Sequence, residues 1–205
     1  MKDEIKKIVS FFGVDTDDTS IDKLENYIFL LEKWNKAYNL TAIRNREEML
    51  QKHLIDSLSI ASHISGEKLI DVGTGAGLPG IPLAIVFPEK HFDLLDSNGK
   101  KTRFLQQARQ QLQIDNITVI NQRVEDYHPG PVYDAVLSRA FASLKDMLDG
   151  TEHLCKENGC FLAMKGQYPE RELQEIKKPY KVLSITWPGN QADRHLIIIS
   201  QSPRG

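Results

Sequence analysis

The sequence predicts an α/β fold in which a helical extension precedes a mostly parallel sheet of seven strands. Two observations give this prediction. From residue 1 to about 65, apolar residues recur at spacings of three and four, which is typical of amphipathic helices. After residue 65, short apolar runs alternate with helical stretches, which is typical of βα units. We therefore expect an N-terminal helical extension over residues 1–65 and a second domain over residues 66–205.

Composition narrows the class of protein. The chain has 205 residues and a formal net charge of −2, so it can bury a sizeable core but shows no global basic excess. An obligate nucleic-acid coat is therefore disfavoured. The N-terminal stretch MKDEIKKIVSFFG has too few consecutive apolar residues for a signal peptide or a membrane span, which favours a cytoplasmic protein. Cys155 and Cys160 are expected to be reduced structural thiols, and no metal site is expected.

Three helices are expected in the extension. The first should bury Ile5, Ile8, Val9 and Phe12. A capping box formed by Thr19 and Asp22 should open the second helix, whose apolar stripe is Ile21, Leu24, Ile28 and Leu31, extended by Tyr27, Trp34 and Tyr38. Asn45 with Glu48 should cap the third, on which Met49, Leu50, Leu54 and Leu58 recur. We expect the aromatic stripe to be core and not a surface for base stacking.

The second part should alternate strands with helices. Strands are expected at residues 68–72, 91–96, 117–121, 133–139, 161–165, 181–187 and 195–200, and helices near 78–87, 100–112, 144–154 and 169–176. Only residues 188–194 join the last two strands. A connection that short permits an antiparallel pair but is too short for a crossover helix.

The most informative stretch is KLIDVGTGAGLPGIPL, residues 68–83. An apolar strand ends there, and Gly73, Gly75, Gly77 and Gly80 follow within eight residues. Glycines permit a turn with positive φ and a close approach of backbone to a ligand. Pro79 suits the first turn of the helix that follows. The pattern predicts a strand that turns into a helix around a cofactor.

Two cofactors fit the glycine turn. A nicotinamide dinucleotide would use the helix N-terminus for its pyrophosphate and Asp96, 23 residues after Gly73, for its ribose. S-adenosylmethionine is favoured by Asp71, which can balance the charge of the methionine end, by the antiparallel hairpin, and by the lack of sequence for a second domain. Asp71 or Asp96 could instead cap a helix.

The cysteines and the residues after the fourth strand indicate which kind of atom would accept the methyl group. Pyrimidine carbon methylation commonly needs a cysteine nucleophile, and neither cysteine is expected at the strand ends. Exocyclic amines usually call for Asn or Asp followed by Pro-Pro and an aromatic residue, whereas this chain has Ser138-Arg139-Ala140-Phe141. A target with an available lone pair, such as a purine ring nitrogen, is favoured because it needs no general base. Protein and small-molecule acceptors stay open.

Seven segments together resemble one family, the bacterial small-subunit rRNA methyltransferase G family. They are WNKAYNLTAI (34–43), HLIDSL (53–58), IDVGTGAGLPGIPLAI (70–85), LLDSNGKKTRFL (94–105), RVED (123–126), LSRAFASL (137–144) and MKGQ (164–167). The resemblance implies a class I S-adenosylmethionine-dependent methyltransferase fold, Rossmann-like with a C-terminal antiparallel hairpin. It also implies formation of 7-methylguanosine in the 530 loop of 16S rRNA, at guanine 527 in conventional numbering.

The glycine turn and the resemblance together give the expected site. The donor, S-adenosylmethionine, should contact Asp71, Gly73, Thr74, Gly75, Gly77, Leu78, Asp96, Ser97, Val124, Glu125 and Arg139. Arg139 and Lys165 are the catalytic candidates, with a salt bridge or surface charge as the alternative for each. Expected RNA contacts are Arg44, Arg46, His53, Lys100, Lys101, Arg103, Arg139, Lys165 and Arg194.

The expected partner is 16S rRNA or the small ribosomal subunit, with the target base extruded from its loop. No membrane and no obligate protein partner are expected, and a monomer is favoured. Three alternatives stay open: a methyltransferase for another RNA or for protein, an RNA-binding ribosome assembly factor that keeps a donor site without turnover, and a nicotinamide oxidoreductase.

Overall fold

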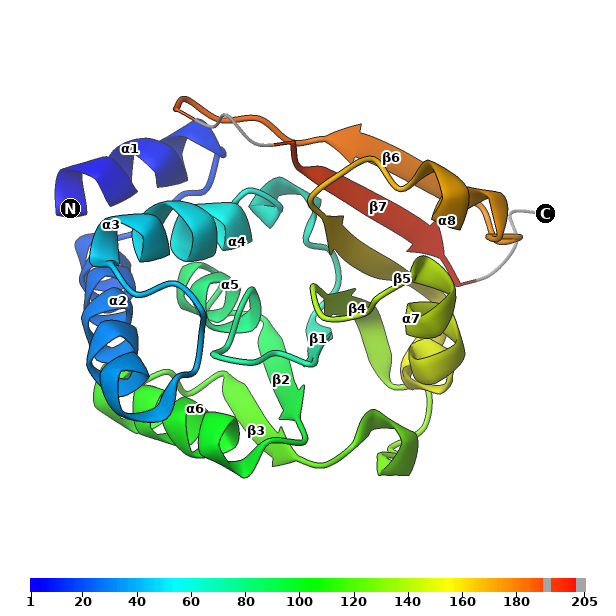
Figure 1. The fold of residues 1–205 in the computed structure, drawn as a ribbon, viewed down its shortest axis with the longest axis horizontal. Coiled ribbons are helices and arrows are strands. Elements are labelled where there is room, and N and C mark those ends of the chain that lie inside the picture. The colour runs from blue at the N-terminus through cyan, green and yellow to red at the C-terminus, as the bar shows by residue number, and fades with distance from the viewer. Residues whose placement is uncertain (190–192, 202–205) are drawn as a thin grey trace.

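A computed structural model, describing residues 1–189 and 193–201, shows one seven-stranded sheet between two layers of helices (Figure 1). The strand order is β3-β2-β1-β4-β5-β7-β6. β1 to β5 are parallel, and β7 runs antiparallel to both β5 and β6. This confirms the predicted class I methyltransferase fold, including its C-terminal antiparallel hairpin.

The strands follow the apolar runs of the sequence. Their bounds are β1 Lys68–Val72, β2 His91–Asp96, β3 Ile117–Asn121, β4 Tyr133–Ser138, β5 Cys155–Lys165, β6 Tyr180–Ser184 and β7 His195–Ser200. β1 and β2 are almost wholly buried, as expected for interior strands covered on both faces. Residues 190–192, within the predicted connection 188–194, lie outside the described residues.

The helices of the sheet domain are α5 Gly80–Val86, α6 Gly99–Leu112, α7 Leu144–Thr151 and α8 Glu170–Gln174. The extension contains α1 Lys2–Phe11, α2 Asp18–Tyr38, α3 Arg46–Met49 and α4 Asp56–Leu58. A π-helical turn, Leu50–Ile55, makes α3 and α4 one continuous helical segment over residues 46–58. Short 3₁₀ turns occupy Ala61–His63, Val124–Asp126 and Glu152–Leu154. No helix among the described residues is long and apolar enough to cross a membrane.

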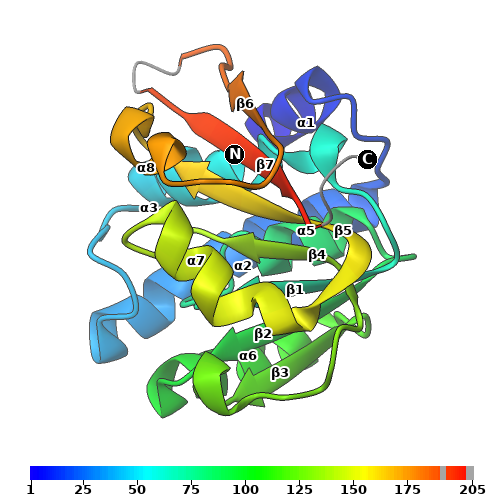
Figure 2. The ribbon, with the colours of Figure 1, turned by 90° about the vertical axis from the view of Figure 1, so that its right-hand side faces the viewer.

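The two faces of the sheet bury different helices. α7 and α8 cover one face, which is turned toward the viewer in Figure 2, with Leu144, Met147 and Leu173 in its core. α1 to α6 cover the other face, so the extension and the sheet share one hydrophobic core that runs from Ile5 to Leu196. Because this core is continuous, the extension is in position to shape the site. A division of the chain at residue 65 stays a prediction.

The extension also holds the glycine turn directly. Tyr27 of α2 is fully buried, and its hydroxyl donates a hydrogen bond of 2.8 Å to the carbonyl of Ala76. Its ring packs against Phe104 of α6, as does that of Trp34. The expectation of an aromatic core is confirmed for Tyr27, and Trp34 is half-buried. Tyr38 is 47% exposed, so the core prediction was wrong for it, because α2 ends there, beyond the packed surface.

Several local predictions need correction. Asp17, and not Thr19, caps α2 by accepting a hydrogen bond from the Ser20 backbone. Asp17 lies three residues ahead of Ser20, so it competes directly with the predicted pair. Pro79 is the residue that caps α5 and does not lie within its first turn. The cap at Asn45 is confirmed, with its side chain accepting from the Glu48 backbone.

The fifth strand and the helix before it also differ from prediction. The helix expected at 144–154 ends as α7 at Thr151, and Cys155 lies at the start of β5 and not in a helix. β5 therefore begins six residues before the predicted Phe161. It pairs with β4 through both Cys155 and Cys160, with a register shift between Tyr133 and Ala135. The polar residues of this first half hid it from a search for apolar runs.

Candidate functional site

The carboxyl ends of the parallel strands meet at one edge of the sheet, where open α/β sheets bind ligands. The antiparallel β7 adds a further residue to this edge. Because Lys165 at the end of β5 pairs with His195 at the start of β7, the residue before β7, Arg194, reaches the same edge. The site therefore combines loops after β1 to β5 with a side chain that precedes β7.

The glycine turn after β1 has the conformation that the sequence predicts. Gly73, Gly75 and Gly77 have φ of 69°, 63° and 91°, which L side chains rarely adopt. A Cβ on Gly73 would lie 2.6 Å from the Cβ of Ala140 in the loop after β4. The glycine at position 73 is therefore required both by its backbone and by the close approach of the β4 loop.

Asp71 holds this turn from inside the protein. The side chain is fully buried, and Oδ2 accepts hydrogen bonds from the Thr74 hydroxyl (2.6 Å) and the Gly80 backbone (2.9 Å). Oδ1 is buried with no hydrogen-bond partner among the described residues. Burial raises the pKa of Asp71 from 3.8 to about 6, although both hydrogen bonds and the nearby Arg139 oppose this. Asp71 thus ties β1 to Gly80, the first residue of α5, which agrees with the alternative that Asp71 caps a helix.

Asp96 at the end of β2 holds the turn from the other side. Its Oδ2 accepts a hydrogen bond of 2.9 Å from the Gly75 backbone, and its Oδ1 accepts one of 2.8 Å from the Asn98 backbone. The Nζ atom of Lys101 lies 3.8 Å from Oδ2 of Asp96. The cap of α6 is Asn98, which accepts from the Lys100 backbone, so the capping alternative for Asp96 is wrong. Asp96 is 7% exposed and faces a cavity.

We call this cavity the glycine-side cavity. It has a volume of about 320 Å³ and is lined by Val72, Gly73, Leu95, Asp96, Ser97, Lys101, Gln122, Arg123, Val124, Glu125, Ala140 and Phe141. It therefore lies beside the ends of four parallel strands. The predicted donor contacts Gly73, Asp96, Ser97, Val124 and Glu125 are brought together in its wall. Asp71, Thr74, Gly75, Gly77 and Leu78 do not line the cavity, and they belong to β1 or to the glycine turn after it.

A second cavity of about 320 Å³, the arginine-side cavity, lies where the extension meets the sheet. Its wall is formed by Ile43, Lys52, His53, Asp56, Ser59, Ile60, Arg139, Met164, Lys165, Gly166, Ile185, Arg194 and His195. The loop after β4 contributes to both cavities, since Arg139 lines this one and Ala140 and Phe141 line the other. The predicted donor contact Arg139 therefore lies on the other side of that loop.

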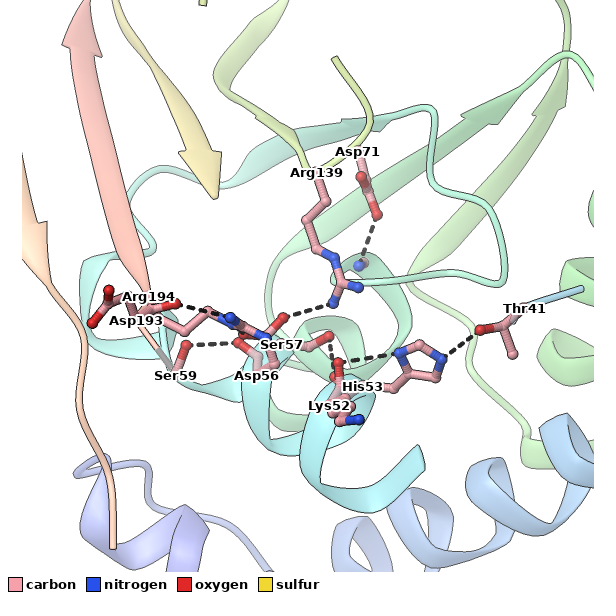
Figure 3. A network of polar contacts seen from close by, with 11 residues as sticks. Thr41, Lys52, His53, Asp56, Ser57, Ser59, Asp71, Arg139, Asp193 and Arg194 are labelled. Atoms are coloured by element: carbon pink, nitrogen blue, oxygen red, sulfur yellow. Dashed lines mark hydrogen bonds and ion pairs between the residues drawn. The ribbon is translucent and has the colours of Figure 1, made fainter. Parts of the chain in front are cut away.

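Asp56 forms ion pairs with both arginines of this cavity (Figure 3). Arg139 donates from Nη1 to its Oδ2 at 3.0 Å, and Arg194 donates from Nε to its Oδ1 at 2.7 Å. The carboxylate is 5% exposed and comes from the helical segment 46–58 of the extension. Arg139 comes from the loop after β4, and Arg194 comes from the residue before β7. A buried carboxylate needs such partners, because removing a charge from water is costly.

His53 and Lys165 complete the polar wall. His53 is 6% exposed, and its ring contacts the Thr41 hydroxyl at 2.8 Å. Burial, followed by the nearby Arg139, lowers its pKa to about 4, so His53 is neutral at pH 7. Lys165 pairs with Glu172 of α8 at 2.9 Å. The salt-bridge alternative is therefore found for both Arg139 and Lys165, and both still line the cavity.

The other predicted RNA contacts are distributed over the surface. Arg44 and Lys100 are exposed, and Arg103 is exposed with Nε bonded to the Gly99 carbonyl. Arg46 pairs with Glu32 and lies 4.4 Å from the Phe29 ring centroid. Lys101 lines the glycine-side cavity and so faces the predicted donor. The RNA-binding roles of all these residues stay predictions.

Sequence reasoning missed several cavity residues. Asp56 is the most important of them, and Gln122, Arg123, Ala140, Phe141 and Met164 were also not proposed as site residues. A signal for Asp56 was present: with Met49 and His53 it continues the spacing of three and four on the buried face of its helix. Polar residues on an apolar stripe indicate a buried polar cluster.

Neither cysteine lines either cavity. Cys155 and Cys160 are free thiols, which confirms that they are unpaired, and burial raises the pKa of Cys155 to about 12. Among residues 1–189 and 193–201, no group of three His, Cys, Asp or Glu side chains is arranged to hold a metal ion.

Solved structures with a similar fold include S-adenosylmethionine-dependent methyltransferases. One from Aquifex aeolicus superposes with a TM-score of 0.58 and 15% identity, covering 75% of this chain and 93% of that chain. A TYW2 protein from M. jannaschii in complex with AdoMet has a TM-score of 0.55 and 18% identity, covering 73% and 75%. The fold and the glycine turn therefore define a class I, Rossmann-like methyltransferase architecture.

Sequence comparison identifies the family. The model of rRNA small subunit methyltransferase G matches residues 20–196. A protein of that name from Hydrogenovibrio crunogenus is 53% identical over 193 residues, covering 93% of this chain and 89% of its own. Another from Marinomonas sp. is 51% identical, covering 97% of each. The chain belongs to the rRNA small subunit methyltransferase G family, as the sequence resemblance implied.

Proposed function

We propose that the chain transfers the methyl group of S-adenosylmethionine to N7 of a guanine in 16S rRNA, at position 527 of the 530 loop in conventional numbering. The observation that carries the proposal is the pair of cavities on either side of the β4 loop. One is lined by the glycine turn and Asp96, and the other by Arg139, Lys165 and Arg194. A small charged donor and a polyanionic acceptor need two sites of this kind at one sheet edge.

The glycine-side cavity has groups that fit each part of the donor. Asp96 supplies carboxylate oxygens for ribose hydroxyls, and Val72, Leu95 and Val124 supply apolar surface for the adenine ring. Gly73 leaves room for the methionine portion, and the unpartnered Oδ1 of Asp71 supplies a buried negative charge nearby. When bound, the donor supplies a sulfonium methyl group. The donor site and its residues are expected from these groups together with the AdoMet bound by TYW2.

The transfer needs little chemistry from the protein. The N7 lone pair forms the new N–C bond as the C–S bond breaks, which leaves S-adenosylhomocysteine and a cationic guanine with no proton to remove. The chain's contribution is then to position the base and to balance charge. Arg139 and Lys165 are held in place by Asp56 and Glu172, so they can position the base without reorganising. Guanine O6 is an acceptor suited to either cation.

The RNA backbone would be positioned by cations around the arginine-side cavity. Arg194 and Lys52 lie in its wall, and Arg44, Lys100 and Arg103 are exposed elsewhere on the surface. We expect a cytoplasmic monomer that acts on the small ribosomal subunit or its rRNA. Light scattering of the purified protein would test the monomer, since the mass of a dimer would contradict it.

The direct test is incubation of small subunits that lack the modification with radiolabelled S-adenosylmethionine. Borohydride and aniline treatment then cleaves the rRNA at 7-methylguanosine. Cleavage at the target guanine is expected only after incubation with enzyme and donor. Label elsewhere in the rRNA or in protein would instead support the alternative acceptors. Donor binding without transfer would support an assembly factor, and tighter binding of NADH than of S-adenosylmethionine would support an oxidoreductase.

A further inference from the structure

Asp56 is a buried carboxylate in a cavity whose other charged side chains are cations. Lys52, Arg139, Lys165 and Arg194 share its wall. A cavity that bound only phosphate would gain nothing from a carboxylate, because like charges repel. Asp56 also belongs to the extension, whereas Arg139 follows β4 and Lys165 is the last residue of β5. Asp56 is therefore expected to have a role other than binding the RNA backbone.

The Asp56–Arg139 pair presents an acceptor beside donors. Each carboxylate oxygen of Asp56 accepts one hydrogen bond from an arginine, Oδ2 from Arg139 and Oδ1 from Arg194. Each oxygen can accept more than one bond. Arg139 uses only Nη1 in this pair, so its guanidinium keeps other N–H groups that can donate. The cavity wall thus carries a fixed acceptor next to a fixed donor.

That pattern is complementary to one edge of guanine. Guanine presents the acceptor O6 beside the donors N1–H and N2–H₂, and adenine presents a donor at C6 beside the acceptor N1. We propose that Asp56 is the residue that makes the site specific for guanine, accepting from N1–H and N2–H₂ while Arg139 donates to O6. With adenine, both contacts would place like groups opposite each other, so adenine would be rejected.

The same carboxylate assists the reaction. Methylation at N7 places a positive charge on the purine, which strengthens hydrogen bonds from N1–H and N2–H₂ to a carboxylate. At 5% exposure Asp56 is weakly screened, so this strengthening is larger than it would be in water. The contact is thus stronger in the transition state than in the bound substrate, and its loss should lower kcat.

This inference rests on the proposed function, and base substitution tests it separately. Small subunits would be reconstituted with 16S rRNA carrying guanosine or inosine at the target position. Inosine keeps N7, O6 and N1–H but lacks the N2 amine. The wild-type enzyme should methylate inosine roughly tenfold less efficiently, as expected for the loss of one contact to a buried carboxylate. Asp56→Asn, which keeps only one acceptor oxygen and no charge, should be slower on guanosine and should show a smaller preference for guanosine over inosine than the wild type.

The matched control is Asp134→Asn. Asp134 pairs with Lys156 and with the backbone of Glu67 and Lys68, and it lines neither cavity. This variant should keep the wild-type preference for guanosine, which separates base recognition from a general loss of an ion pair. Thermal unfolding of both variants measures their folded fraction.

The outcomes are distinct. No methylation of guanosine subunits by the wild type would defeat the proposed function itself. Methylation of guanosine and inosine at equal rates by the wild type would overturn the role of Asp56 without any variant. An unchanged guanosine preference in Asp56→Asn, with or without tighter rRNA binding, would also overturn it and would indicate a cavity for phosphate.

Discussion

The two cavities are similar in size but are built in different ways. The glycine-side cavity is lined only by the sheet domain, at strand ends, in the segments after them and at Lys101 of α6, and backbone groups fix its shape, since Gly75 and Asn98 both donate to Asp96. The arginine-side cavity joins three parts of the chain through side-chain ion pairs on Asp56. The first kind of construction suits a cofactor of constant shape, and the second suits a base that arrives within a large RNA.

Substitution of Gly73 should break the glycine-side cavity alone. In Gly73→Ala the new Cβ would lie 2.6 Å from the Cβ of Ala140. The backbone φ of 69° is also unfavourable for alanine, so the turn must move. We expect donor affinity, measured by calorimetry, to fall about 100-fold or more, from strain of roughly 3 kcal/mol. Gly130→Ala is the control, because Gly130 has a φ of 85° and open space around it. Equal loss of donor binding in both variants would show that the effect does not depend on the contact between residue 73 and the β4 loop.

Substitution of Arg139 should affect only the arginine-side cavity. Arg139→Ala leaves Asp56 with Arg194 alone and removes a candidate donor to the base. We expect kcat/KM for methyl transfer to fall about 100-fold, as when one positioned donor is lost from an active site. Donor affinity should stay within a few-fold of wild type. Lys156→Ala removes another ion pair, that with Asp134, and should leave transfer unchanged. A large loss of donor affinity in Arg139→Ala would place this residue in the donor site.

Asp71 is near residues of both cavities, since the charges of Arg139 and Asp96 both act on its pKa. Substitution of Asp71 tests whether its charge or its hydrogen bonds are needed. Asp71→Asn keeps an oxygen that can accept from Thr74 and Gly80 but removes the charge. Because the pKa in the folded protein is raised to about 6, the acid form stabilises the fold below pH 4, and this stability is lost as the pH rises through 6. Asp71→Asn should therefore be no less stable than wild type at pH 7.

The same variant should bind the donor roughly tenfold more weakly at pH 7, because the buried negative charge would be gone. In the wild type, donor affinity should rise between pH 5 and 7 as Asp71 ionises, and in Asp71→Asn it should be flat over this range. Thermal unfolding and calorimetry at both pH values measure the two effects. Unchanged affinity in the variant would leave Asp71 with a purely structural role.

The smallest effect is expected where the extension supports the glycine turn. Tyr27→Phe leaves the buried carbonyl of Ala76 without its hydrogen bond, which costs about 1–3 kcal/mol. The Tm should fall by several degrees, with a change in donor affinity of only a few-fold. Tyr180→Phe, at a position 46% exposed, should change neither. A wild-type Tm in Tyr27→Phe would show that the extension does not stabilise the turn through this bond.

The same contrast explains how much could be predicted from sequence. Gly73, Asp96 and Val124 each lie at or just after a strand end, so their convergence follows from the parallel sheet once its strands are recognised. Asp56 precedes Arg194 by 138 residues, and their pairing depends on the docking of the extension and on β7 running antiparallel to β5. No local pattern contains that information. The polar first half of β5 and the cap at Asp17 were missed because competing local signals lay within a few residues.

The donor and the base should occupy separate cavities, one on each side of the β4 loop. The most direct measurement is S-adenosylhomocysteine affinity and methyl transfer to undermethylated small subunits, determined on the same preparations of wild type, Gly73→Ala and Arg139→Ala. Gly73→Ala should lose both properties, whereas Arg139→Ala should bind S-adenosylhomocysteine like wild type and transfer the methyl group about 100-fold more slowly. Loss of both properties in both variants, or wild-type transfer by Arg139→Ala, would contradict separate cavities for donor and base.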